Sequence, residues 1–347
     1  MIRFSWLQFR AQAVAALGAL AIVAVALAVT GPHLNHLYDT SGVATCHARG
    51  DCASVATTFL NQVPADQILY YLGIAVLLAA PPVIGMFWGA PLVTRELETG
   101  TVRLAWTQGV TRTRWLAVKV AVTGLAAMVT AGLLSLMLTW WSGPVDTAAA
   151  LKTGYSISFI RIGPVLFGAR DIMPVGYAAF AFALGVTAGV LIRRTVPAIA
   201  ATLVVFAAVA IAWPLLIRPL LIAPVHAIVA LTPASISTSL AAGPGGSEIV
   251  MPVASAVPPG SWVLSTRTLD STGHAFNAAT VPACQGSSPS QALACQATLG
   301  RLHLRDLISY QPASSFWPLQ WYETAIFLGL AALLAGLCLW RIRRQAS

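Results

Sequence analysis

The sequence predicts an all-α polytopic membrane protein with six transmembrane helices, both termini in the cytoplasm and a long extracytoplasmic loop before the last helix. Three observations support this fold class: the composition, the length of the uncharged segments and the placement of arginine and lysine. Apolar residues make up 57% of the 347 positions and charged residues only 9%. So few charges cannot cover a soluble globule with water-binding groups.

Six segments lack Asp, Glu, Lys and Arg, and each approaches the length needed to cross the hydrocarbon core. No small-residue cleavage site follows the first segment, so we expect it to remain as an anchor rather than to be removed as a signal peptide. Pro81 and Pro82 are expected to kink the second helix. The segments are residues 11–38, 67–94, 120–145, 172–192, 195–217 and 324–340.

The basic residues indicate which side faces the cytoplasm. An even number of spans places both termini on one side, and twelve of the 20 Lys and Arg residues fall in the short segments on that side. Because basic residues concentrate in cytoplasmic loops, the termini are expected inside the cell. Anionic lipid at that face accounts for most of the net charge of +9, so no nucleic-acid partner is required. The twelve are Arg3, Arg10, Arg95, Arg103, Arg112, Arg114, Lys119, Arg193, Arg194, Arg341, Arg343 and Arg344.

The cysteines give a second indication of the same orientation. Cys46 and Cys52 fall in the first outer loop, and Cys284 and Cys295 fall in the third. An oxidising compartment permits disulfides, so we predict the pairs Cys46 with Cys52 and Cys284 with Cys295. Free thiols remain the alternative, because sequence alone does not fix connectivity.

The chain divides into three regions. Residues 1–217 hold the first five helices, preceded at residues 1–10 by a short interfacial helix or a frayed basic terminus. Within this region, residues 142–171 are expected to form an outer segment lying on the surface. Residues 218–319 are expected to form an outer cap with a strand at 262–268, and residues 320–347 the sixth helix and a basic tail.

The sequence lacks the motifs of several kinds of chemistry. The predicted spans carry no ionisable residue in their interiors, and Glu323 stands at the outer edge of the sixth. The phosphate-binding pattern GxxxxGK[ST] is absent, so any ATP that drives this protein must bind to another chain. We predict no catalytic residue and no metal site, since neither the histidines nor the serines stand in a suitable constellation.

The densest charge lies in residues 93–119, between the second and third helices, with five basic and two acidic residues. We expect Gly100 to end one helix and Lys119 to extend from the next toward the headgroups. Leu104 and Trp106 would then be apolar knobs on a protruding elbow. The elbow either docks on a protein or rests on lipid headgroups, and Glu96 and Glu98 favour a protein, because carboxylates gain nothing from an anionic leaflet.

The string APLVTRELETGTVRLAWTQGVTRTRWLAVK in this loop resembles the inner loop of ABC transporter permeases of the type-2 exporter class, especially an actinobacterial group. The resemblance extends through GPVDTAAALKTGYSISF, DIMPVGYAAFAFALGVTAGVLIRRTVPAIAATL and SYQPASSFWPLQWYETAIF, and it is weaker in the outer loops. In that family the loop is a coupling helix that docks on a separate ATP-binding subunit. The resemblance implies an ATPase contact at Glu96, Glu98, Gly100, Thr101 and Arg103, with Leu104 and Trp106 as docking residues.

The resemblance therefore implies the permease subunit of an ATP-driven exporter in the cell membrane. Two permease copies and two ATP-binding subunits are expected, with ATP and Mg bound by the partner and no cofactor bound by this chain. An amphiphilic or hydrophobic passenger fits spans without buried charge. The competing interpretation is a membrane-anchored sensor or enzyme whose active part is residues 218–319.

Overall fold

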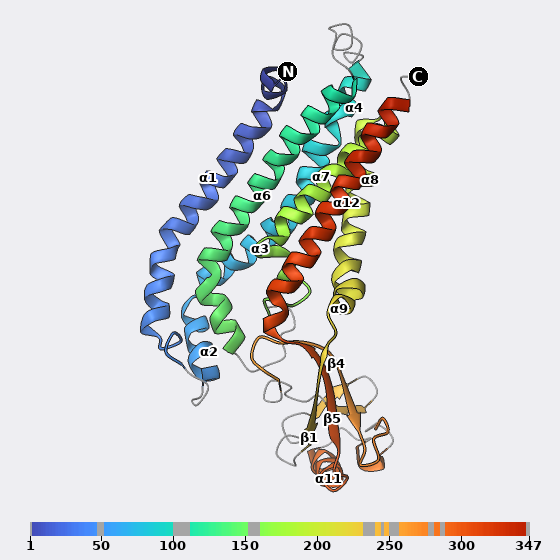
Figure 1. Ribbon diagram of the computed structural model, residues 1–347. Helices are drawn as coiled ribbons and strands as arrows, with labels where there is room; N and C mark the ends of the chain where they lie inside the picture. Colours follow the sequence, from blue (N-terminus) through green and yellow to red (C-terminus); the bar gives the residue numbers. More distant parts are fainter. Residues whose placement is uncertain are drawn as a thin grey trace.

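The computed structural model describes residues 2–46, 52–99, 112–151, 160–231, 240–243, 246–249, 257–276, 281–284 and 289–344. Within these residues, six helical segments are long and apolar enough to cross a membrane, and they coincide with the six predicted spans. Both ends of the chain lie at one end of the helix bundle and the β-strands lie at the other (Figure 1). We call these the terminus end and the sheet end. The six segments are Gln12–Thr40, Pro64–Arg95, Leu116–Leu151, Met173–Ile192, Thr195–Leu221 and Ala313–Arg344.

The first helix, α1 (Ile2–Thr40), runs without interruption, so the residues predicted as a separate interfacial helix form its first turns. At the sheet end a disulfide joins Cys46 to Cys52, the first residue of the short helix α2 (Cys52–Gln62). Leu34 of α1 and Phe59 of α2 are fully buried in one apolar cluster that also includes residues of the second and third spans.

The second span is bent, as the prolines predict. Helix α3 (Pro64–Ile84) contains Pro81 and Pro82 and passes into a π-helical turn, η1 (Gly85–Gly89), before α4 (Pro91–Thr99). Proline removes a backbone donor and clashes with the carbonyl one turn earlier, and π-turns absorb such irregularities. The bend aims α4 toward the terminus end (Figure 1).

The third span, α6 (Arg112–Leu151), has 40 residues and is therefore about 60 Å long, roughly twice the thickness of the hydrocarbon core. Its last turns extend the helix into the segment predicted to lie on the surface. Farther along that segment, Ile162, Leu166 and Phe167 are at most 1% exposed and pack inside the bundle, whereas Val165 is 45% exposed. The surface prediction was wrong for the three buried residues, because their apolar side chains are covered by neighbouring elements.

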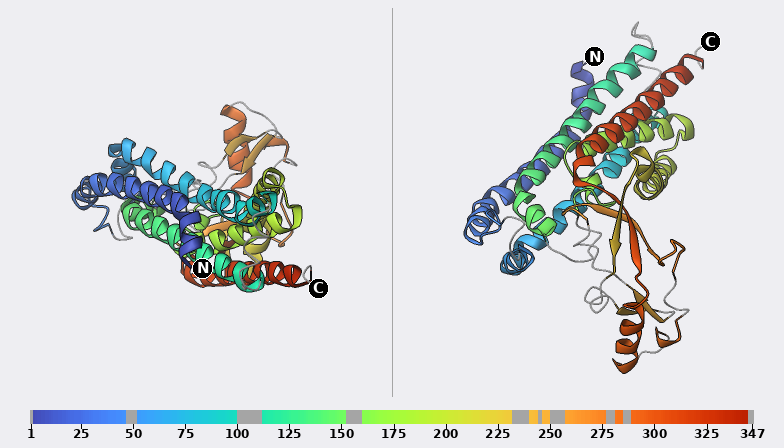
Figure 2. Two further views of the ribbon diagram at one scale, coloured as in Figure 1. Left: turned by 90° about the horizontal axis from the view of Figure 1, so that it is seen from above. Right: turned by 60° about the horizontal axis from the view of Figure 1, so that its bottom comes forward.

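Helix α7 (Met173–Ile192) is the central helix of the bundle. In its most apolar 18-residue stretch 78% of the residues are buried, whereas the corresponding share is 11% in α1 and 11% in the span that contains α12 (Phe316–Arg344). Glycine and alanine supply many of its residues, which lets neighbouring helices approach closely. Helix α8 (Thr195–Ala212) returns beside it and continues through a π-turn, η4 (Trp213–Ile217), into α9 (Arg218–Leu221). From above, α1 lies at one edge of the bundle and α12 and α8 toward the other (Figure 2).

The all-α prediction was wrong for residues 218–319, whose described parts contain antiparallel strands. Strands β1 (Val225–Ala230), β5 (Arg305–Gln311) and β4 (Trp262–Leu269) form a sheet in the order β1-β5-β4. The alternating segment at 262–268 did predict β4. A second disulfide joins Cys284 of η7 (Pro282–Cys284) to Cys295 of α11 (Pro289–Leu299). The hairpin β2 (Leu240–Gly243) and β3 (Gly246–Ile249) and the short turns η3 (Phe167–Ala169) and η8 (Ala313–Ser315) complete the described elements.

Exposed aromatic side chains mark both ends of α12. Trp321 is 63% exposed near the sheet end and Trp340 is 49% exposed near the terminus end. These two positions are separated by about 28 Å of helix, close to the thickness of the hydrocarbon core. Tryptophan favours the membrane–water interface, so the two rings indicate where the bilayer surfaces meet the bundle.

Candidate functional site

We call residues 93–119 the predicted coupling loop. Its first residues belong to α4, which ends at Thr99 at the terminus end of the bundle (Figure 1). Glu96 and Glu98 lie in the last turns of α4. The side chain of Glu98 is described and exposed, whereas the side chain of Glu96 is not described. The other predicted contact residues lie outside the described residues: Gly100, Thr101, Arg103, Leu104 and Trp106.

The carboxylate of Glu98 binds the first residue of α8. Its Oε1 accepts a hydrogen bond from the Thr195 backbone N–H at 2.8 Å, and its Oε2 accepts one from the Thr195 hydroxyl at 2.8 Å. These two bonds, the backbone one foremost, hold the pKa of Glu98 below its usual value. The N-cap residue of α8, Arg194, makes no side-chain cap of its own. Glu98 therefore caps α8 from a different helix, where a negative charge also complements the helix dipole.

Thr94 extends this contact one turn deeper into the bundle. Its hydroxyl lies 2.8 Å from the hydroxyl of Thr195 and 3.1 Å from the Ala90 carbonyl, to which it donates. Each hydroxyl carries one hydrogen, so when Thr195 donates to Glu98, the single Thr94 hydrogen is shared between the Ala90 carbonyl and the Thr195 oxygen. The result is a polar link from α4 to the start of α8.

Lys119 holds α6 against the same region. Its ammonium lies 3.4 Å from the Leu92 carbonyl and the residue is 5% exposed. The prediction that Lys119 extends toward the headgroups was wrong, because the side chain turns inward against α4. Lysine thus connects the two helices that flank the predicted coupling loop.

Glycines bring the second span into backbone contact with α7. A Cβ on Gly89 would stand 2.5 Å from the Phe182 carbonyl oxygen, and one on Gly189 would stand 2.7 Å from the Ala90 carbonyl oxygen. No larger residue fits at such distances without moving a backbone. Helix α4 and the π-turn before it therefore pack on α7 with little freedom to slide.

The turn between α7 and α8 is as short as predicted. Arg193 adopts a left-handed conformation with φ of 60°, and its N–H donates to the Gly189 carbonyl at 3.0 Å, which ends α7. Pro197 lies in the first turn of α8, where its missing donor costs little. Arg193 and Arg194 are both exposed at the tip of this hairpin.

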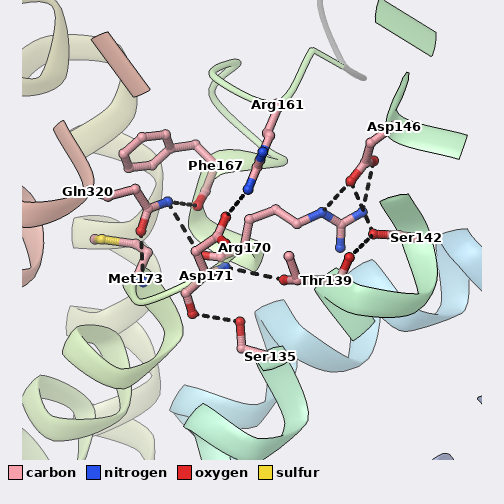
Figure 3. Close-up of polar contacts among 10 residues, drawn as sticks. All are labelled: Ser135, Thr139, Ser142, Asp146, Arg161, Phe167, Arg170, Asp171, Met173 and Gln320. Atoms are coloured by element: carbon pink, nitrogen blue, oxygen red, sulfur yellow. Dashed lines mark hydrogen bonds and ion pairs between the residues drawn. The ribbon is translucent and has the colours of Figure 1, made fainter. Parts of the chain in front are cut away.

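A buried polar cluster at the sheet end was missed by the sequence analysis. Figure 3 shows Asp146 of α6 facing Arg170, whose Nε and Nη2 each lie 3.2 Å from the carboxylate. Ser142 donates to the same carboxylate at 3.0 Å and Tyr70 of α3 donates to it at 2.6 Å. Arg170 is 1% exposed, so this ion pair is shielded from water.

The neighbouring residue Asp171 adds a second set of bonds. Arg161 donates to its carboxylate at 2.7 Å, and the Ser135 hydroxyl donates to its carbonyl at 2.7 Å (Figure 3). Gln320 of α12 accepts from the Met173 N–H at 3.0 Å and donates to the Phe167 carbonyl at 3.2 Å. These bonds fasten the 160–172 segment between α6 and α12.

A third buried contact joins α9 to α12. The guanidinium of Arg218 binds the Glu323 carboxylate through Nε at 2.6 Å and Nη2 at 3.1 Å, and both residues have no exposed surface. It also stacks over the Phe167 ring at 4.0 Å. The sequence predicts Glu323 at the outer edge of the sixth span but does not identify its partner. The weak signal for this pair is that one acidic residue and one basic residue stand alone near the ends of two spans.

The arrangement at the terminus end is a mechanical connection between helices. Within the described parts of the chain, no group of three or more His, Cys, Asp or Glu residues is arranged to hold a metal ion. The short helix α4, in which Arg95 and Glu98 are exposed, ends at Thr99. It touches α6 and α8 through the bonds of Lys119 and Glu98, and the two residues directly before it, Gly89 and Ala90, touch α7 through the backbone.

The fold and this site define a class: a multi-pass membrane protein with six spans and a charged connection between the second and third. Residues 17–218, more than half of the chain, match the family described as ABC-2 membrane transporter related, and the chain belongs to that family. It is accordingly a transport subunit of the permease type, a family that implies an ATP-binding partner. Searches of curated proteins and of solved structures found no match.

Proposed function

We propose that this chain is the transmembrane subunit of an ATP-driven exporter and that residues 93–119 dock on a separate ATP-binding subunit. The terminus end of the bundle would face the cytoplasm, since it carries the predicted inner-side arginines and the start of this loop. The disulfides at the sheet end fit an oxidising exterior.

The single observation that carries the proposal is the construction of α4. It holds residues 93–99, the first part of the predicted docking loop, and among the described residues it is the last element before α6. Gly89 and Ala90, directly before α4, contact α7 through the backbone, and α4 itself is held to α6 by Lys119 and to α8 by Glu98. A force applied to the loop would thus reach three helices at once. A loop that merely rested on lipid headgroups would need no such attachment.

The partner subunit supplies the chemistry. ATP and Mg would bind there, and closure of two ATP-binding subunits would pull on the loops of two permease copies in a homodimer. This chain lacks the phosphate-binding pattern in its sequence. Its role is to convert that closure into rearrangement of the spans.

The passenger we propose is amphiphilic or hydrophobic. The charged residues of the ion pairs described above are each paired with an opposite charge, and both pairs lie near the sheet end of the bundle. The rest of the described spans present chiefly Ala, Val, Leu and Gly. Such surfaces favour a passenger that partitions into the membrane over a small ion.

Co-purification tests the docking assignment. Trp106→Ala should weaken association with the ATP-binding subunit while leaving membrane insertion intact, because aromatic anchors carry much of the energy of protein interfaces. Trp140→Ala is the matched control, since Trp140 is 66% exposed on α6, far from the loop. Unchanged co-purification of the Trp106→Ala chain would show that the loop is not the docking site.

The competing function, a sensor or enzyme centred on residues 218–319, predicts a different partner. Such a chain would not require a cytoplasmic ATPase. If the wild-type chain purifies without any ATP-binding subunit under conditions that preserve the membrane complex, the exporter proposal fails.

A further inference from the structure

Helix α8 has a polar attachment at each end, and both attachments involve a charged residue. At its start, Thr195 is bound by Glu98 of α4. Beyond its far end, after η4 and still in the same spanning segment, Arg218 is bound by Glu323 of α12. The segment from α8 to α9 thus connects the base of the predicted coupling loop with the sheet end of the bundle.

We propose that the Glu98–Thr195 contact is the link through which movement of the coupling loop reaches α8, and that Glu98 and Thr195 are positioning residues for coupling. This inference rests on the proposed function and deepens it. The predicted coupling loop joins the second span directly to the third. The structure adds a route through the fifth.

The geometry favours a link over an incidental surface contact. Both carboxylate oxygens of Glu98 are used, each at 2.8 Å, and the two donors come from one residue. A two-point contact fixes direction as well as distance, so α4 cannot rotate away from α8 without losing both bonds. Thr94 supports Thr195 from the buried side, which keeps the hydroxyl in place.

The rest of the neighbourhood makes Glu98 the natural transmission point. The backbone contacts of Gly89 and Gly189 hold α4 and α7 together as one unit. Helix α8, in contrast, follows α7 after the two-residue turn Arg193–Arg194. In the most apolar 18-residue stretch of its span only 22% of the residues are buried. It is therefore the neighbour with the most freedom to tilt, and Glu98 grips it at its first residue.

The far end of α8 is built to bend. The π-turn η4 begins at Trp213 and includes Pro214, and π-turns and prolines are common sites of helix distortion. A tilt of α8 at Thr195 would therefore bend the segment at η4, next to Arg218, which is held by Glu323. In this way a pull at the terminus end would reach the buried contacts at the sheet end.

The experiment measures the distance between two spin labels on this chain, in the complete complex with its ATP-binding subunit reconstituted in lipid nanodiscs. Leu136→Cys on α6 and Leu220→Cys on α9 take spin labels, since they are 66% and 82% exposed. Background labelling is low because Cys338 is 2% exposed and the other four cysteines are paired. The distance is recorded without nucleotide and with ATP plus vanadate. We expect the wild-type distance to change on nucleotide trapping.

Thr195→Val is the decisive variant, because it removes the hydroxyl without touching the predicted docking residues. The ATP-binding subunit should still co-purify, but the nucleotide-dependent distance change should fall to less than half of the wild-type change. Thr195→Ser keeps the hydroxyl and should restore it. Glu98→Gln should reduce the change as well, and combining it with Thr195→Val should add little, as for two residues in one contact.

Asp39→Asn is the matched charge control, since Asp39 is an exposed carboxylate in the last turn of α1, at the sheet end of the bundle and far from Glu98. Its distance change should equal that of the wild type. A full wild-type change in Thr195→Val would overturn the inference while leaving the exporter proposal intact. The absence of any bound ATP-binding subunit in the wild-type preparation would overturn the exporter proposal, and this inference with it.

Discussion

Arg218 and Glu323 form a bidentate ion pair in which neither side chain reaches solvent, although 105 positions separate them in the chain. Two charges removed from water are costly unless they satisfy each other, and here the geometry pairs them closely. The pair fastens the end of the fifth span to the start of the sixth. Replacing one residue of the pair should change the free energy of unfolding more than replacing both residues together.

Glu323→Ala should lower the free energy of unfolding by about 3–5 kcal/mol, because it leaves the Arg218 guanidinium buried without a counter-charge. The double variant Arg218→Met, Glu323→Leu should recover most of that loss, since apolar residues of similar volume remove both charges. Thermal unfolding of the purified chain in detergent measures both. Arg343→Ala, an exposed arginine at the other end of α12, is the control. Equal losses in the single and double variants would contradict the charge argument.

The close approach of η1 and α4 to α7 leads to a prediction at single glycines. Gly89→Ala should destabilise the chain by about 1–3 kcal/mol, because the added Cβ meets the Phe182 carbonyl oxygen at 2.5 Å and a backbone must shift. Gly329→Ala and Gly18→Ala add a Cβ in open space and should be neutral or slightly stabilising. The melting temperatures of the three variants in one detergent provide the comparison. A Gly89→Ala chain as stable as the controls would show that α4 is free to move from α7.

The sequence predicted the features that depend on local composition. The six spans follow from uncharged length, the bend of the second from Pro81 and Pro82, and the hairpin from Arg193–Arg194. Strand β4 follows from its alternation. Each of these is decided by residues that are neighbours in the chain.

The features that the sequence could not supply depend on distant partners. Glu98 meets Thr195 across 97 positions, and Gln320 meets Met173 across 147. Hydropathy treats an ionisable residue near a span end as exposed, whereas Glu323 is fully buried against Arg218 and the side chain of Asp146 is only 13% exposed beside Arg170. The sheet that includes β4 could not be predicted for a similar reason: β1 pairs with β5, whose residues lie some 80 positions later.

Asp306 in strand β5 gives the domain formed around the three-stranded sheet a pH dependence. Burial raises the pKa of its carboxyl above the usual 3.8, although the Thr268 hydroxyl donates to it at 2.7 Å. The folded state therefore holds this proton more tightly than the unfolded state. The domain should gain stability as the pH falls through the raised folded pKa, and the gain should be complete near the ordinary value.

Asp306→Asn imitates the protonated carboxyl at every pH. It should raise the melting temperature at pH 7.5, where the wild type carries the buried charge, and the difference from the wild type should narrow at pH 5. Asp270→Asn is the comparison, because hydrogen bonds, that of the Thr272 hydroxyl foremost, lower the pKa of Asp270, and removing its charge should not stabilise. A lower melting temperature for Asp306→Asn at pH 7.5 would show that the charged form is the favoured one.

The orientation of the bundle decides whether a cytoplasmic ATPase can reach the coupling loop. Ser271→Cys places a thiol on an exposed turn at the sheet end, and Arg343→Cys places one at the terminus end of α12. In intact cells a membrane-impermeant maleimide should label Ser271→Cys, whereas Arg343→Cys should react only after permeabilisation, because basic residues favour the cytoplasmic side. The wild-type chain is the blank, since its described thiols are paired or buried. The reverse pattern would put Glu98 and the loop that follows it outside the cell, where no ATP-binding subunit could act on them.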